Sequence, residues 1–163
     1  MAKYPQFTTP PPTFDGKVPM VARGGVDEAV LARAEQAVAA LADQYGTWVS
    51  KDQDQLEIHL KALIRNPQRH DKILPLLFKC AHDMKGQGSL FGYDLITRIG
   101  NSLCRFIEMI PAEPGPDELQ VITLHVQSMR VVVTEQLTDD GGTQGQELIE
   151  GLHRVLERHG SDL

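Results

Sequence analysis

One short segment of the sequence concentrates side chains that can do chemistry, and it runs from His82 to Gly92. The histidine is followed by Lys85 three positions later and by Gly86 directly after the lysine. A neutral imidazole is a competent nucleophile near pH 7, because its unperturbed pKa is about 6.5. Phosphoryl transfer mostly needs a positioned nucleophile and nearby positive charge, since the transferring group spreads negative charge over its oxygens. The segment therefore indicates phosphoryl transfer, with His82 as acceptor and Lys85 stabilising the charge of the phosphate.

The helical periodicity around this segment predicts that His82 points into solvent. At about 100° per residue, one face of the helix collects the apolar side chains of Ile73, Leu77, Cys80 and Met84. This is the face that we expect to be buried. His82 falls roughly 180° from Ile73, on the opposite side. Its neighbours on that outward side are Phe78, Lys85, Gly86 and Ser89.

Three of these neighbours, Phe78, Gly86 and Ser89, are interpreted as residues that dock a partner. A phenylalanine at the surface offers apolar contact area. A glycine inside a helix costs about 1 kcal/mol relative to alanine, so Gly86 needs a reason other than helix stability. Missing side-chain atoms one turn after His82 make sense if the backbone of another molecule approaches the imidazole.

The elements that must position this segment are helices. Asp27 and Glu28 favour a helix start, because negative charge complements the macrodipole there. Apolar residues then recur in steps of three and four as far as Leu63, and the pair Asn66–Pro67 ends the pattern. Two points stay open. Residues 26–63 can form one helix or two helices, with a break near Gly46 or within 50–55. The apolar stripe of this segment can face the core of the chain or a second copy of the protein.

Further helices are predicted over 71–90, 93–109, 116–137 and 146–158, joined by a proline-rich linker at 111–116 and a turn at 139–142. Residues 131–133 would also suit a strand. Helix after helix with short connections predicts an all-α, antiparallel up-and-down bundle of four helices over 26–163, with a long N-terminal helix and an extra C-terminal one. Residues 1–25 are predicted to be a flexible, proline-rich tail.

The order His-x-x-Lys-Gly, followed after five residues by a second glycine, resembles the histidine-containing phosphotransfer (HPt) domain. Here the pattern is His82, Lys85, Gly86 and Gly92. The resemblance covers about 45–137 in architecture and 82–92 in a specific motif. It implies phosphorylation of His82 and exchange with an aspartate of response-regulator receiver domains in two-component phosphorelays. A sensor histidine kinase is the second partner class that it implies.

One position departs from the chemotaxis-kinase branch of this family, where a glutamate on the next helix holds the imidazole Nδ1. A gap-free count from the histidine puts Cys104 at that position. Cysteine is a weak hydrogen-bond acceptor. Either another residue orients the ring of His82, or the ring is held less tightly.

Composition excludes several classes of function. The chain has 163 residues with 16 Lys and Arg against 22 Asp and Glu, a formal charge of −6, so the basic surface of a nucleic-acid binder is missing. Two cysteines inside apolar segments fit free thiols in a reducing compartment. We expect no membrane span, no secretory signal, no metal and no cofactor, and hence a cytoplasmic carrier whose partner supplies the metal and the acidic pocket.

A second interpretation belongs to a different class of protein. The same helices would serve as a non-catalytic adaptor or oligomerisation bundle that binds a receiver domain without carrying phosphate. The sequence does not decide the oligomeric state, the pathway, or the particular receiver or kinase.

Overall fold

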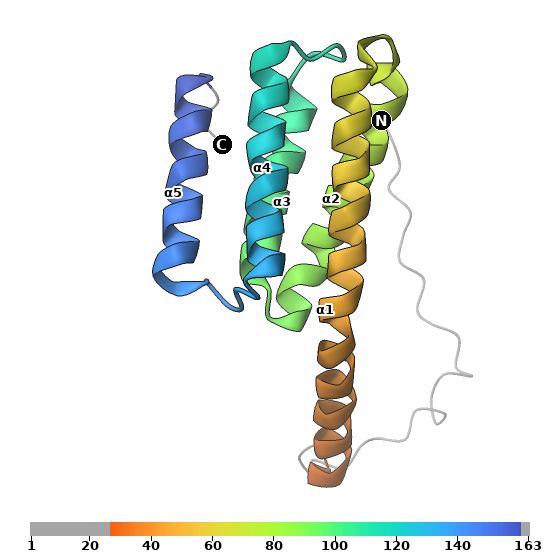
Figure 1. Cartoon of the computed structure of the whole chain (residues 1–163). Helices are drawn as coiled ribbons and strands as arrows, with labels where there is room; N and C mark the ends of the chain where they lie inside the picture. Colours follow the sequence, from red (N-terminus) through yellow and green to blue (C-terminus); the bar gives the residue numbers. More distant parts are fainter. Residues whose placement is uncertain (1–26, 161–163) are drawn as a thin grey trace, which may run out of the picture. The chain divides into compact units, whose positions relative to one another are not determined.

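The computed structural model describes residues 27–160, and these are almost entirely helical (Figure 1). Among them there is no strand, so the predicted all-α class is confirmed and the alternative of a strand at 131–133 is wrong. The elements are α1 (Glu28–Arg65), η2 (Pro67–Arg69), α2 (His70–Gly88), η3 (Ser89–Phe91), α3 (Asp94–Met109), α4 (Pro116–Thr134) and α5 (Gly142–Arg158). No helix in the described range is long and apolar enough to cross a membrane. The predicted tail, 1–25, lies outside the described residues.

Helix α1 is continuous, which answers the question of one helix or two: neither Gly46 nor the polar stretch 50–55 interrupts it. The chain divides into two units, Met1–Ala37 and Val38–Leu163, and the boundary falls inside this helix. Before Tyr45 the large apolar side chains of the stripe are exposed rather than packed in the core of the chain: Val30, Leu31, Val38 and Leu41. Trp48 is also 40% exposed.

Within the second unit, one apolar core lies among α1 from Tyr45 onward, α2, α3 and α4. The apolar face of α3 was predicted correctly: each member of its stripe is buried, namely Leu95, Ile96, Ile99, Leu103, Phe106 and Ile107. From α1 the side-chain amide of Gln53, fully buried, donates to the carbonyl oxygen of Val126 on α4 at 2.9 Å. Helix α4 lies between α1 and α5 in Figure 1, and α5 adds Leu152 and Leu156 to the core.

Two helix boundaries differ from the sequence-based expectation by more than two residues. Helix α4 ends at Thr134 rather than at residue 137, because the backbone turns at Gln136 with φ of +52°. Helix α5 begins at Gly142 rather than at residue 146. Gly141, with φ of +67°, makes the turn into it, a conformation that glycine adopts without steric cost. Gly145 then packs under the carbonyl of Asp140, where no Cβ would fit.

Candidate functional site

His82 lies on the outward side of α2, as the periodicity predicts, and 56% of its side chain is exposed. Its ring is stacked beside that of Phe78, one turn earlier, with centroids 5.9 Å apart and an interplanar angle of 25°. Phe78 itself is half-buried and packs against the core, so less of it reaches the surface than the sequence suggested. The aromatic contact restricts the imidazole on one flank and leaves the rest of the ring open to solvent.

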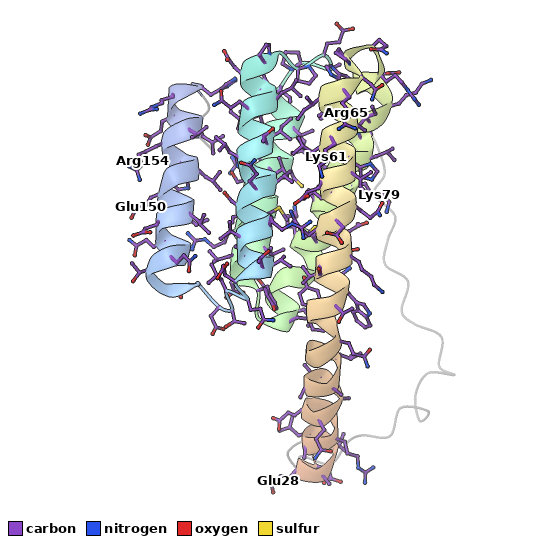
Figure 2. The ribbon with its side chains drawn as sticks, viewed as in Figure 1. Glu28, Lys61, Arg65, Lys79, Glu150 and Arg154 are labelled. Carbon is purple, nitrogen blue, oxygen red and sulfur yellow. The ribbon has the colours of Figure 1, made fainter. Side chains whose placement is uncertain are left out.

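The carboxylate of Asp83 lies on the Nδ1 side of this imidazole. The distance from Nδ1 to Oδ1 of Asp83 is 4.0 Å, too long for a hydrogen bond. The same carboxylate accepts a hydrogen bond from the Lys79 ammonium at 2.9 Å, and this interaction raises the pKa of Lys79. The Lys79 side chain projects away from the helices (Figure 2). Asp52 of α1 lies on the same flank: burial, with a smaller contribution from Asp83, raises the pKa of the Asp52 carboxyl. The residue beside Nδ1 is therefore a carboxylate that is already paired with an ammonium, and no hydrogen bond to a described residue orients the ring of His82.

Lys85, the predicted phosphate-side cation, is half-buried between α2 and α3. Its ammonium donates to the side-chain oxygen of Asn101 on α3 at 3.4 Å, a long hydrogen bond. This contact fixes the direction in which the lysine extends, toward α3 and away from Asp83. Part of the Lys85 side chain remains exposed to solvent on the surface of α2 that carries His82.

The two helices run antiparallel at this point, which sets the level of each α3 side chain relative to His82. The Cβ position of Gly88 lies against Tyr93 and Thr97, and that of Gly100 lies against Lys85 and Ala81, so residue numbers rise along α3 as they fall along α2. Asn101 is therefore near the level of His82 along the pair, and Arg105 lies about one turn further, near the level of Phe78. The arginine is exposed.

The two glycines that follow Lys85 have different environments. A Cβ added to Gly86 would meet no heavy atom within 4 Å. A Cβ on the buried Gly88 would come within 2.6 Å of the Thr97 hydroxyl and 2.8 Å of the Tyr93 carbonyl. Gly88 is thus required by packing against α3, whereas packing gives no reason for Gly86.

The end of α2 is held to α3 by the hydroxyl of Thr97, a residue that the sequence analysis did not single out. This hydroxyl donates to the carbonyl of Lys85 and accepts from the backbone N–H of Ser89, both at 2.9 Å. Gly100 allows the close approach, since a Cβ there would lie 3.1 Å from Cβ of Lys85. Ser89 itself is exposed at the start of η3, and Gly92, with φ of +78°, ends that turn.

Neither cysteine takes part in the chemistry of this surface. Cys104 is 2% exposed, and burial raises the pKa of its thiol; among the described residues no hydrogen bond joins it to His82. Cys80 is half-buried and donates to the carbonyl of Asp52 at 3.3 Å, and burial together with that aspartate raises its pKa to about 11. The residue beside Nδ1 is therefore Asp83, the immediate neighbour of the histidine in the sequence.

The structure brings the five predicted residues onto one surface of α2 and η3: Phe78, His82, Lys85, Gly86 and Ser89. Sequence reasoning missed Asp83, Thr97, Gly100 and Asn101, and it gave Arg105 no position relative to His82. Only Asp83 carried a usable signal, because a carboxylate next to a histidine is visible in the sequence. Comparison with known proteins yields no relative: no protein-family model matches the chain, and no curated protein or solved structure is significantly similar to it.

Proposed function

We propose that this chain is a phosphoryl carrier of the HPt type, in which His82 accepts a phosphoryl group and passes it to or from an aspartate of a receiver domain. In this proposal α1 from Tyr45 onward, α2, α3 and α4 form the four-helix HPt-like bundle, and α5 is an addition to it. The observation that carries the proposal is the pair His82 and Gly86. The imidazole of His82 is exposed, and Gly86 follows it one helical turn later. A Cβ at Gly86 would meet no other atom of the chain, so packing does not require a glycine there, and the space beside the imidazole is open.

The proposed step is a displacement at phosphorus. The lone pair of His82 Nε2 forms a bond to the phosphorus of the receiver's aspartyl phosphate, and the bond from phosphorus to the aspartate oxygen breaks. The electron pair leaves with the carboxylate, and the imidazole keeps its proton on Nδ1, next to Asp83. The ammonium of Lys85 offsets the negative charge that spreads over the three phosphoryl oxygens. The reverse reaction returns the group to the receiver.

The receiver supplies what this surface lacks. It brings the phosphorylated aspartate, the metal ion and the acidic pocket around it, so the carrier is not an enzyme by itself. Phe78, Gly86 and Ser89 form its docking surface in this proposal, and the interface is small, at or below about 1,200 Å², since a relay component must release its partner. The proposed location is the cytoplasm, with a sensor histidine kinase as the second partner class.

The direct test is transfer from receiver domains of the same genome, each loaded with labelled phosphate. We expect acid-labile label on the wild-type chain and none on His82→Gln. His59→Gln is the matched control, because His59 lies half-buried on α1, a helix that contributes none of the five residues of this surface, and it should be labelled like the wild type. Label that persists in His82→Gln, or transfer from no receiver at all, would rule out the proposal.

A second candidate function is an interaction module that never carries phosphate. The observation in its favour is the row of exposed apolar side chains on α1, including Leu31, Val38 and Leu41, which follows the spacing of a helix-pairing seam. This alternative predicts that His82→Gln keeps receiver binding and all biological output. Substituting Val38 and Leu41 with serine would instead abolish function.

A further inference from the structure

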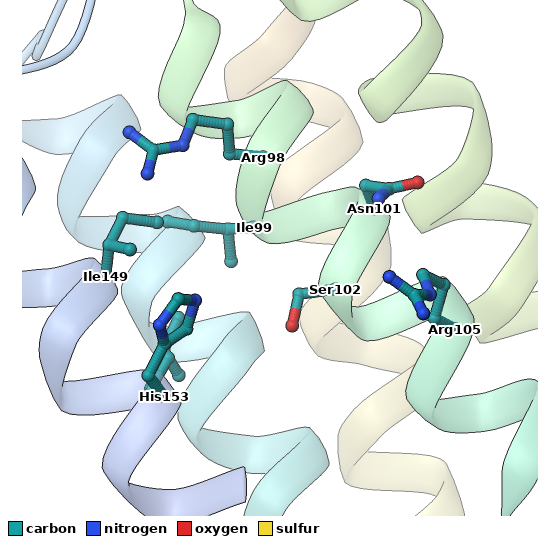
Figure 3. Close-up of a pocket in the computed structure, with 8 residues that line it drawn as sticks. Arg98, Ile99, Asn101, Ser102, Arg105, Ile149 and His153 are labelled. Carbon is teal, nitrogen blue, oxygen red and sulfur yellow. The ribbon is translucent and has the colours of Figure 1, made fainter. Parts of the chain in front are cut away.

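A cavity of about 210 Å³ lies between α3 and α5, and none of the five predicted site residues lines it, although Asn101, which accepts from Lys85, does (Figure 3). Its apolar wall is formed by Ile99 and Leu152, both buried in the core, and by the half-buried Ile149. Ligand pockets for drug-sized molecules measure about 300–1,000 Å³. The cavity therefore fits only a small molecule.

The polar groups around this cavity are basic. Arg98 and Arg105 of α3 and His153 of α5 line it, and no aspartate or glutamate does. None of the three side chains forms a hydrogen bond or ion pair with another described residue. Arg130 shows the contrast, because two carboxylates, Glu57 and Asp54, accept from its guanidinium at 2.6 Å each. In a chain with a formal charge of −6, two unpaired arginines beside one cavity leave positive charge without a protein partner.

The hydroxyl of Ser102 adds an acceptor to the same cavity. Its oxygen lies between His153 and Arg105 in the view of Figure 3. The Nδ1 of His125 is 2.8 Å from the carbonyl of Val121, which can only accept, so Nδ1 carries the proton and the neutral ring's Nε2 is an acceptor. Ser102 therefore donates its proton to that Nε2, at 3.0 Å. The Ser102 oxygen can therefore offer a ligand only its lone pairs. These accept a hydrogen bond from a hydroxyl group of a ligand, but they cannot donate one to an anionic oxygen.

We propose that this cavity is a binding site for a small dianion, a phosphate or a short dicarboxylate. The two guanidinium groups bind its oxygens, His153 contributes a ring N–H, and the wall of Ile99, Ile149 and Leu152 contacts the carbon atoms when the ligand is a dicarboxylate. Guanidinium groups match both anions, because their planar donors pair with two oxygens at once. The site does not depend on phosphotransfer at His82.

The test is a titration of the full chain, labelled with ¹⁵N, at constant ionic strength. The probes are inorganic phosphate, succinate and, as an uncharged match for succinate, butane-1,4-diol. We expect saturable shifts of the backbone amides of Ser102, Ile149 and His153 with at least one dianion. Phosphate alone identifies a phosphate site, succinate alone a carboxylate site, and both a general dianion site.

The variant Arg98→Gln/Arg105→Gln removes the proposed charge and should weaken binding at least about tenfold, since the charge-assisted hydrogen bonds to the dianion are lost. Both side chains are exposed and unpaired, so the rest of the spectrum should stay unchanged. The control Arg65→Gln/Arg69→Gln removes the same charge from exposed positions that do not line the cavity. Three results would overturn the proposal: no saturable shift with either dianion, equal binding of the diol, or equal weakening in the control.

Discussion

Replacing Gly86 separates a structural role of this glycine from a functional one. In a helix interior, glycine is less stable than alanine by about 0.5–1 kcal/mol. The backbone of Gly86 is helical, and an added Cβ meets nothing within 4 Å. We therefore expect Gly86→Ala to raise the free energy of unfolding by about 0.5–1 kcal/mol, which for a chain of this size raises Tm by about 1–4 °C.

The same substitution should slow phosphotransfer, because the added atoms occupy the space over which a receiver approaches His82. A methyl group should slow transfer less than a larger side chain. We expect transfer to fall from wild type to Gly86→Ala to Gly86→Leu, by at least about tenfold for leucine, or about 1.4 kcal/mol in the barrier. The assays are urea unfolding and the initial rate of transfer from one phosphorylated receiver.

Two other glycines serve as matched controls. Gly151 on α5 also has nothing within 4 Å of an added Cβ, so Gly151→Ala should stabilise the chain and leave transfer unchanged. Gly88→Ala should destabilise by about 1–3 kcal/mol, because the new Cβ meets the Tyr93 carbonyl at 2.8 Å. A loss of stability in Gly86→Ala would show that the glycine is needed by the fold, and transfer at the wild-type rate in Gly86→Leu would refute the clearance argument.

Three further outcomes test the electrostatics. Lys85→Ala should slow transfer about tenfold with unchanged unfolding in urea; a wild-type rate would remove the lysine from the proposed step. The pKa of Glu57 in the folded chain lies below its ordinary value of 4.5, chiefly because Arg130 donates to its carboxylate. The stabilisation from this pair is therefore complete above pH 4.5 and is lost as the pH falls through the lower pKa of the folded state. Arg130→Met should make Tm depend less on pH in this acidic range. Burial holds the pKa of His125 in the folded chain below 6.5, so as the pH falls the unfolded chain binds a proton at this residue before the folded chain does. The free energy of unfolding should therefore decrease as the pH falls from 6.5 toward the pKa of the folded state. His125→Gln should remove this dependence on pH.

Periodicity predicted α3 well and the start of α1 badly, for one physical reason. An apolar stripe shows which face of a helix seeks cover, but not whether a neighbour lies there. Along α3 the neighbours are α2 and α4, and the whole stripe is buried. Along α1 the same kind of stripe remains exposed at Val38 and Leu41. Gln53 shows the opposite error, since a polar residue is fully buried there by bonding a backbone carbonyl 73 positions away.

The site was predictable where it depends on one helix and unpredictable where it depends on two. The outward position of His82 follows from angles along α2 alone. The difference between Gly86 and Gly88 does not, because both stand near the end of the same helix and only Gly88 meets Thr97 of α3. Asn101 is likewise identified by a contact across helices, which a single sequence does not encode as a pattern.

The charges around His82 also favour one direction of approach for a phosphoryl group. On the flank toward α1, the carboxylates of Asp83 and Asp52 are close enough to influence each other, and they repel phosphoryl oxygens. On the flank toward α3, the ammonium of Lys85 lies against Asn101. In the proposed transfer the proton stays on Nδ1, beside Asp83, and Nε2 is the nucleophile. The carboxylates on one flank and the ammonium of Lys85 on the other thus favour approach of the phosphate from the side of α3.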